Sequence, residues 1–332
     1  MASELETRPS PIAEFIMKGL LAEDSGQVFS KIKRQLFRRV RKQMAGRNFF
    51  VRYQLAGREI VLPLEHDLPI LRKVYPQYSA NVGRLCSYIR KKYPGLQMID
   101  VGANVGDTVA IVREHCDCAI LCIEGNEYYF GLLQENLRRG RYESVRAVRA
   151  LVATYTGELK GNLVSSSGSA HFVEDDGASV QVSRLSDVLE RFPEFRDPKF
   201  LKIDTDGFDC GILRSEVEWL ALHRPAIFFE YDPFFFHQQP YDGTQIFKDL
   251  AKAGYRYGML YDNFGDYLLS LDLQRDANQL EDLQTYYLGR LGHTYMDVLL
   301  LHQQDGDLSA EIRNQELRWS AQWRLMEKPG GH

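Results

Sequence analysis

MIDVGANVGDT, residues 98–108, decides the fold: a short apolar run ends in a glycine-rich loop, and a helical pattern follows the loop. The next apolar run, AILCIEGN at residues 119–126, ends at Glu124. Together the two stretches predict the first β-loop-α-β unit of a nucleotide-binding sheet. The backbone of such a loop can approach a ligand closely, and an acid at the end of the second strand can accept hydrogen bonds from a ribose diol.

The spacing of the loop glycines indicates the kind of nucleotide. Gly102 and Gly106 are separated by Ala-Asn-Val, so the middle glycine of a GxGxxG pyrophosphate loop is absent. Asp100 precedes the loop and Asp107 opens the helix, and these acids would repel a pyrophosphate and attract a cation. S-adenosylmethionine (SAM) carries an ammonium, a sulfonium and no phosphate, so the loop favours SAM over NAD. Taken alone, the same glycines could also serve a tight turn with close packing of helix and strand.

Strands and helices alternate from Gln97 to the end of the domain, which predicts an α/β fold. We expect a mostly parallel sheet with helices on both faces and an antiparallel edge hairpin at residues 255–271. The expected strands are residues 98–101, 119–124, 145–152, 200–204, 226–231 and 296–302. Residues 157–177 are rich in Gly and Ser and are expected to form irregular strands or loop.

The chain divides into three predicted parts: an N-terminal helical extension (1–48), the main domain (49–303) and a C-terminal helical tail (304–332). Residues 28–44, VFSKIKRQLFRRVRKQM, predict a basic amphipathic helix with seven cations and no acid. This helix either packs on the domain with a solvated basic face, or contacts an anionic membrane or an acidic partner. The apolar pattern after Leu308 leaves a homo-oligomer open.

Composition narrows the function classes. A hydrophobic fraction of 44% and a charged fraction of 26% are ordinary for a globular protein, and the net charge of −4 argues against a general nucleic-acid binder. The five cysteines have no zinc spacing and are expected to be buried free thiols in a reducing compartment. The sequence shows no secretory signal and no membrane-spanning run, so we expect a cytoplasmic protein, with peripheral membrane contact left open.

Two further strand ends carry acids. FLKIDTDGFDCGIL, residues 200–213, delivers Asp204 and Asp206 where ligands of open α/β sheets bind. IFFEYDP, residues 227–233, ends in Glu230 and Asp232, and an aromatic loop with His237 follows it. The less specific interpretation is that Asp206 caps a helix, that Asp209 faces solvent, that the aromatic residues belong to the core and that His237 is a surface histidine.

In this order, MIDVGANVGDT, CIEGN, FLKIDTDGF and RPAIFFEYDP resemble the FkbM-type SAM-dependent methyltransferases. The resemblance covers residues 96–233 and implies a Rossmann-like class I methyltransferase fold. It also implies methyl transfer from SAM to a hydroxyl of a sugar, polysaccharide or natural product. The chain departs from the family at Asp206, where Glu is more usual, and at Gly125, which replaces a proline.

Carried over by position, the resemblance places Asp100, Gly102, Asn104 and Gly106 at the methionine end of SAM. Glu124 would bind the ribose, and Asp204 would lie between cofactor and substrate. The predicted cofactor-binding set is Asp100, Gly102, Asn104, Gly106, Thr108, Glu124, Asn126 and Asp204. A hydroxyl acceptor benefits from a general base, and the candidates are Asp204, Asp206, Glu230 and His237.

Other interpretations stay open at this point. Asp204, Asp206 and Glu230 could hold a divalent metal, although the spacing fixes no His or Asn beside them and a metal is not predicted. The competing functions are a NAD-dependent sugar oxidoreductase and a non-catalytic protein that binds SAM or an acidic partner. The predicted acceptor is a glycan or another sugar-containing molecule, and no nucleic acid is expected.

Overall fold

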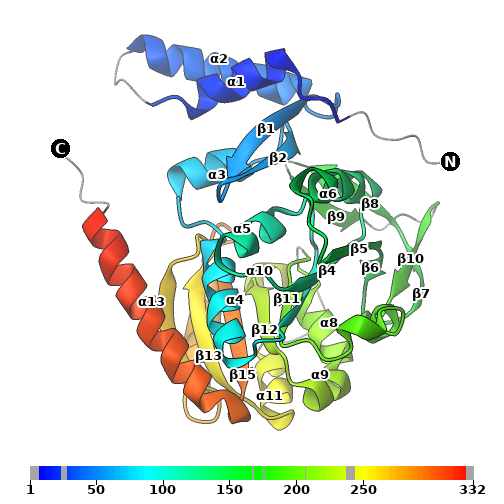
Figure 1. The fold of residues 1–332 in the computed structure, drawn as a ribbon, viewed down its shortest axis with the longest axis vertical. Helices are drawn as coiled ribbons and strands as arrows, with labels where there is room; N and C mark the ends of the chain where they lie inside the picture. The colour runs from blue at the N-terminus through cyan, green and yellow to red at the C-terminus, as the bar shows by residue number, and fades with distance from the viewer. Residues whose placement is uncertain are drawn as a thin grey trace.

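An eight-stranded sheet forms the centre of the computed structural model, which describes residues 7–23, 28–166, 168–173, 175, 177–205, 207–236 and 244–326 (Figure 1). Its strand order is β14-β13-β15-β12-β11-β3-β4-β5. The strands are β3 (Gln97–Val101), β4 (Ala119–Glu124), β5 (Val145–Arg149), β11 (Phe200–Ile203), β12 (Ala226–Tyr231), β13 (Tyr255–Asp262), β14 (Tyr267–Asp272) and β15 (Met296–His302).

The direction of the strands confirms the expected α/β fold. The five strands from β12 to β5 run parallel, whereas β15 is antiparallel to both β12 and β13. The β13–β14 hairpin forms the antiparallel edge that the sequence predicts. All four residues of β11 are buried, as expected for a strand covered on both faces.

Helices cover both faces of this sheet, because alternate residues of each central strand point to opposite sides. Met98, Ile120 and Phe200 belong to the core under the helices α4 (Ala80–Lys92), α5 (Asp107–His115) and α13 (Gly306–Met326). Ile99 and Leu121 belong to the core under α8 (Asp209–Ser215) and α11 (Gln245–Lys252). The helices after the first strand of the sheet are α5 (Asp107–His115), α6 (Glu127–Gly140), α7 (Leu185–Leu189), α8 (Asp209–Ser215), α9 (Val217–His223), α10 (Pro233–Phe236), α11 (Gln245–Lys252), α12 (Ala277–Leu288) and α13 (Gly306–Met326), with short 3-10 turns at Pro193–Phe195 and Gln303–Asp305.

The segment between β5 and α7 differs from the prediction. The expected strand 145–152 is two strands, because the chain leaves the large sheet after Arg149 and β6 (Leu151–Val152) pairs with β10 (Ser179–Ser183) instead. The Gly/Ser-rich stretch is more regular than expected. It contains β7 (Gly157–Lys160), paired with β10, and a hairpin of β8 (Asn162–Ser166) and β9 (Ser169–Val173).

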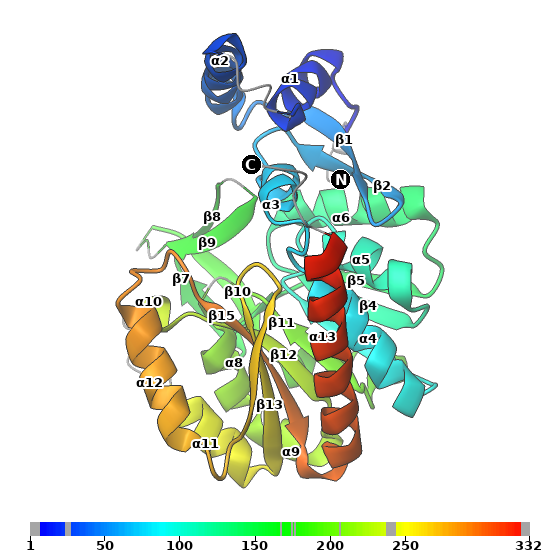
Figure 2. The same cartoon turned by 90° about the vertical axis from the view of Figure 1, so that its left-hand side faces the viewer.

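An N-terminal layer lies beyond one end of the sheet (Figure 2). It contains α1 (Pro11–Leu21), α2 (Val28–Met44), the β1 (Phe50–Leu55)–β2 (Arg58–Pro63) hairpin and α3 (Leu68–Val74). The next helix, α4 (Ala80–Lys92), already packs on a face of the sheet. The Asn136 side chain of α6 bonds to both backbone groups of Val61 in β2, and so ties this layer to the main domain. The helix at 28–44 is the one that the sequence predicted. No described helix has the length and apolarity needed to cross a bilayer.

A buried ion pair fastens the C-terminal helix. Arg84 of α4 donates to both carboxylate oxygens of Glu316 in α13, at 3.0 and 2.8 Å, and Glu316 has no exposed surface. The ring of Trp319 lies 4.8 Å from the same guanidinium. Removing one partner would leave a buried charge without its counter-ion, which costs more than the pair itself contributes.

We therefore expect Glu316→Ala to lower the free energy of unfolding by about 3–5 kcal/mol, measured by urea denaturation. Glu311→Ala is the matched control, because Glu311 is exposed on the same helix. That control should stay within about 0.5 kcal/mol of the wild-type protein. Equal stability of the two variants would contradict the role given to the ion pair.

Candidate active site

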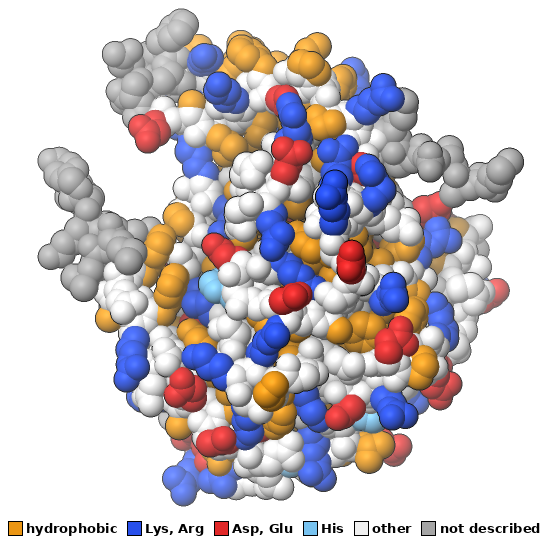
Figure 3. Space-filling view, in the orientation of Figure 1, with side chains coloured by type: hydrophobic (Ala, Val, Ile, Leu, Met, Phe, Trp, Pro, Cys, Tyr) orange, Lys and Arg blue, Asp and Glu red, His pale blue; other side chains and the backbone are white. Residues whose placement is uncertain are grey.

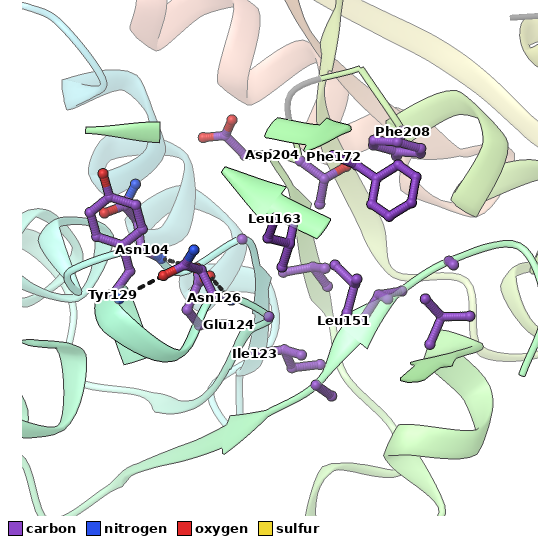
Figure 4. Close-up of a pocket in the computed structure, with 18 of the residues that line it drawn as sticks. Asn104, Ile123, Glu124, Asn126, Tyr129, Leu151, Leu163, Phe172, Asp204 and Phe208 are labelled. Carbon is purple, nitrogen blue, oxygen red and sulfur yellow. Dashed lines mark hydrogen bonds between the residues drawn. The ribbon is translucent and has the colours of Figure 1, made fainter. Parts of the chain in front are cut away.

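Two adjoining cavities open at the carboxyl ends of β3, β4, β11 and β12, and Figure 4 shows the first of them. Apolar side chains form most of the first wall: Ile123, Leu151, Leu163, Phe172 and Phe208, with the polar residues Glu124 and Asn126 at one side. Polar side chains form most of the second wall, around a volume of about 300 Å³: His66, Tyr78, Asp107, Lys202, Glu230 and Tyr295. Gly102, Asn104 and Asp204 line both cavities, so the two spaces meet at these three residues.

The glycine loop has the backbone that its sequence predicts. Gly102 has a φ of 79° and Gly106 a φ of 84°, in the left-handed region that favours glycine. A Cβ on Gly102 would lie 1.8 Å from the carbonyl oxygen of Asp204, so only glycine permits this approach of the two strand ends. Asn104 between them is also left-handed, with a φ of 48°, and lies at the junction of the cavities.

Glu124 is buried at the end of β4, with 7% of its surface exposed, and lines the first cavity. Its carboxylate accepts hydrogen bonds from the backbone N–H groups of Asn104 and Asn126, at 2.8 and 2.7 Å. Burial raises the pKa of this carboxyl above its ordinary value, and the two backbone donors oppose the rise. Each oxygen accepts one backbone bond and keeps a second lone pair, so the pair of oxygens suits a vicinal diol.

Asn126 lines the same cavity, but its side chain also has a structural task. Its Oδ1 accepts from the N–H groups of Tyr128 and Tyr129 and so caps the N-terminus of α6. Thr108 lines the second cavity rather than the first, and Gly106 lines neither. The predicted cofactor residues therefore line the first cavity, the second cavity or both, except Gly106 and Asp100, which line neither.

Lys202 is a buried cation between two carboxylates. Its Nζ lies 3.2 Å from Asp100 Oδ1 and 3.0 Å from Asp204 Oδ2. Burial acts to lower the pKa of Lys202, but Asp100 and Asp204 outweigh it and raise that pKa, so the ammonium persists. Asp100 itself has no exposed surface and lines neither cavity. Its carboxylate therefore pairs with Lys202 without facing either cavity. The resemblance had implied that Asp100 would lie at the methionine end of SAM.

Asp209 holds the loop that carries Asp204. The alternative that it faces solvent is wrong, because no part of its surface is exposed. Its carboxylate accepts from the N–H and the hydroxyl of Thr205, at 3.0 and 2.7 Å, and from the N–H of Glu230 at 3.3 Å. Burial raises the pKa of Asp209 to about 6. The side chain thereby joins the ends of β11 and β12, which carry Asp204 and Glu230.

The four candidate bases have different places. Asp204 and Glu230 both line the second cavity, and 48% of the Asp204 side chain is exposed. Asp206 and His237 lie outside the residues that the structure describes. Asp232, also at the end of β12, is buried and accepts a hydrogen bond from the N–H of Phe234.

Sequence reasoning missed several residues of the second cavity: His66, Tyr78, Lys202 and Tyr295. Burial lowers the pKa of His66 to about 4, and its Nδ1 accepts from the N–H of Leu68, so the ring is neutral with its proton on Nε2. Burial raises the pKa of both tyrosines, so the phenols stay protonated. Only the lysine stands inside a recognised motif, because the others come from loops whose sequence carries no signal.

The carboxylates of the site do not form a metal group among the described residues. Among the described residues, one group of three potential metal-ligand side chains has its ligand atoms within 4.8 Å of one another, and it consists of Cys86, Cys116 and Cys118. Cys116 and Cys118 precede β4 and Cys86 lies in α4, so these thiols are at the opposite end of β4 from Glu124. All five cysteines are buried and free, as predicted.

One protein-family model matches the part of the chain that carries this site. Residues 100–257 match the family described as "Methyltransferase FkbM domain". Among curated proteins, none matches the chain significantly.

Several solved structures are similar to parts of the chain. A precorrin-6Y C5,15-methyltransferase from Geobacter metallireducens has 13% identity and a TM-score of 0.35, covering 63% of this chain and 80% of that one. An O-methyltransferase from Bacillus cereus in complex with SAH has 11% identity and a TM-score of 0.38, covering 67% and 80%. A fibrillarin pre-rRNA processing protein from Methanococcus jannaschii has 9% identity and a TM-score of 0.35, covering 62% and 66%. These scores are low, so the family match carries the assignment.

Glu124→Gln should weaken SAM binding by about tenfold or more, measured by calorimetry, because it replaces one acceptor oxygen by a donor and removes the charge. Glu127→Gln is the control, since Glu127 is exposed three residues later and lines neither cavity. Equal affinities of the two variants for SAM, with unchanged melting temperatures, would remove Glu124 from the cofactor site.

His66 should make the protein less stable in acid. Its folded pKa of about 4 lies below the ordinary 6.5, so the unfolded chain binds more protons between these values. The stabilisation is fully present above pH 6.5 and is lost as the pH falls toward 4, by about 3 kcal/mol in all.

Urea denaturation across this pH range tests the contribution of His66. The fall in stability should be smaller in His66→Gln than in the wild-type protein. The exposed His293→Gln control should follow the wild-type curve. A His66→Gln curve parallel to the wild-type curve would contradict the assignment.

Proposed function

The chain carries an FkbM-type methyltransferase domain and is a SAM-dependent methyltransferase, and we propose that it methylates a hydroxyl group of a sugar, polysaccharide or glycosylated small molecule. The observation that carries this proposal is the meeting of two unlike cavities at Gly102, Asn104 and Asp204. An apolar space with an acid suited to a diol adjoins a polar space, and a carboxylate lies between them.

The first cavity fits the cofactor. Its apolar wall suits an adenine, and Glu124 at its side suits the ribose hydroxyls. Its lining, among the residues described, contains neither Lys nor Arg that would neutralise a pyrophosphate, which favours SAM over NAD. The cofactor supplies a methyl group activated by a sulfonium, and the nearby carboxylates of Asp107 and Asp204 favour such a cation.

The second cavity supports a polyhydroxylated acceptor. Tyr78, Tyr295 and His66 supply hydrogen-bond donors, whereas Glu230 and Asp204 supply acceptors, and sugar hydroxyls need both. Four acidic residues line this space, Asp67, Asp107, Asp204 and Glu230, and Lys202 is the one cation among its described lining residues. An acceptor with phosphate groups would therefore be repelled. A volume of about 300 Å³ is at the lower end of ordinary ligand sites and suits one sugar unit.

Asp204 is the favoured general base. It lines both cavities, and Lys202 holds one of its oxygens at 3.0 Å. With SAM bound, the Asp204 carboxylate would accept the hydroxyl proton of the acceptor as its oxygen took the methyl group. The remaining work of the protein is alignment and the exclusion of water. Glu230 lines only the second cavity, so a role in holding the acceptor suits it better.

Asp204→Asn should lower kcat by about 10²- to 10³-fold, because the amide cannot take the proton. The assay follows labelled methyl groups from SAM to a panel of neutral glycans. The SAM dissociation constant should change far less than kcat, and Glu230→Gln should act mainly on the KM of the acceptor. Full activity of Asp204→Asn would overturn its role as base.

Thermal-shift titration tests the cofactor independently of the acceptor. SAM and S-adenosylhomocysteine should both raise the melting temperature, and NAD should not, because the first cavity lacks phosphate partners. Stabilisation by NAD alone would overturn the proposal.

A further inference from the structure

We propose that α1 and α2 together form a docking surface for an anionic lipid bilayer. We name it the α1–α2 surface, and it consists of exposed apolar and basic side chains at the end of the molecule remote from the large sheet (Figures 1 and 2): Ile12, Phe15, Ile32 and Leu36, with Lys31, Arg38, Arg39 and Lys42. This inference does not depend on the identity of the acceptor.

The apolar part of the surface is unusually exposed. Ile12 and Phe15 of α1 are each 62% exposed, and Ile32 and Leu36 of α2 are 59% and 57% exposed. Within each helix the two residues are three or four positions apart, so they lie on one face. Four large apolar side chains in water on one helix pair indicate a surface that is covered in use.

The inner side of the pair explains why these residues face outward. Phe37 of α2 is buried against α1, where a Cβ on Gly19 would lie 2.1 Å from its ring. Arg41 also points inward: it donates to the carbonyl oxygens of Leu64 and Glu65 and pairs with Asp67 at 2.6 Å. Packing therefore fixes which face of α2 remains for a partner.

The exposed face carries positive charge and no acid. Arg39 lies three residues after Leu36 and seven after Ile32, so it shares their face, and Lys31, Arg38 and Lys42 are exposed beside it. No acidic residue occurs in α2. Apolar side chains bordered by Lys and Arg match an anionic bilayer, where the apolar groups enter the acyl boundary and the cations meet the headgroups. The space-filling view shows both kinds of side chain together at this end (Figure 3).

Charge and shape also argue against a second copy of the chain or an acidic protein as the partner of the α1–α2 surface. In a two-fold dimer through this surface the same patch meets itself, so the cations of α2 would face the cations of a second copy. An acidic protein would be expected to find a groove, whereas this surface is a pair of helices at the extremity of the molecule (Figure 2). A membrane needs no groove, and it satisfies the apolar and the basic residues at once.

Vesicle sedimentation of the full chain tests the proposal. The protein should sediment with vesicles of phosphatidylcholine and phosphatidylglycerol, should not sediment with phosphatidylcholine alone, and should be released as salt is added. Failure to bind the anionic vesicles, or equal binding to both kinds, would overturn the proposal.

Two variants separate the contributions. R38Q/R39Q/K42Q removes three exposed cations and should weaken the partition coefficient by about tenfold or more. I32S/L36S removes the exposed apolar groups and should weaken it similarly at unchanged charge. Arg41 stays unaltered in both variants, because it holds the loop before α3.

The matched control, K248Q/R313Q/R318Q, removes three exposed cations from α11 and α13 and should bind vesicles like the wild-type protein. Equal weakening in the control would mean that net charge alone drives binding and would overturn the proposal. Sedimentation velocity without lipid tests whether a second copy of the chain occupies the surface instead. A dimer that the I32S/L36S variant dissociates would assign the surface to that second copy and overturn the proposal. Retained melting temperatures show that each variant is folded.

Discussion

The closeness of β3 and β11 at their carboxyl ends is the constraint on which the site depends. The carbonyl of Asp204 occupies the space that any side chain at position 102 would need, so a glycine there permits the two strand ends to meet. That contact places the glycine loop of the first motif against the acidic loop of the third. As a result, the apolar cavity and the polar cavity share Gly102, Asn104 and Asp204 as a common wall.

A second constraint is electrostatic. Asp100, Asp107 and Asp204 all lie close to one buried ammonium, that of Lys202, and Glu230 lines the same cavity. Burial raises the pKa of Asp100 and Asp107, and Lys202 opposes the rise in each. A site built in this way holds an excess of negative charge that a sulfonium would partly neutralise. The same excess disfavours phosphate-bearing ligands on either side of the common wall.

The N-terminal part of the chain contributes residues to the polar cavity. His66 follows β2, Tyr78 precedes α4, and both line the polar cavity. Arg41 of α2 binds the segment that contains His66, so the helices of the α1–α2 surface are linked to the wall of that cavity. If the surface meets a bilayer, the contacts of Arg41 connect the membrane-bound helices to the wall of the polar cavity.

Sequence alone determined the local elements: the glycine loop, the strands that end at Glu124, Asp204 and Glu230, the basic helix at 28–44 and the edge hairpin. It succeeded there because hydrophobic period, glycine backbone freedom and charge are properties of neighbouring residues. Only the tertiary structure decided that Asp100 lies behind Lys202, that Asp209 is buried, that β6 leaves the sheet, and that His66, Tyr78 and Tyr295 meet around one cavity. It also decided that Arg41 points inward while Ile32 and Leu36 face outward. These outcomes depend on strand order and on packing between segments far apart in the chain, and no local pattern encodes those distances.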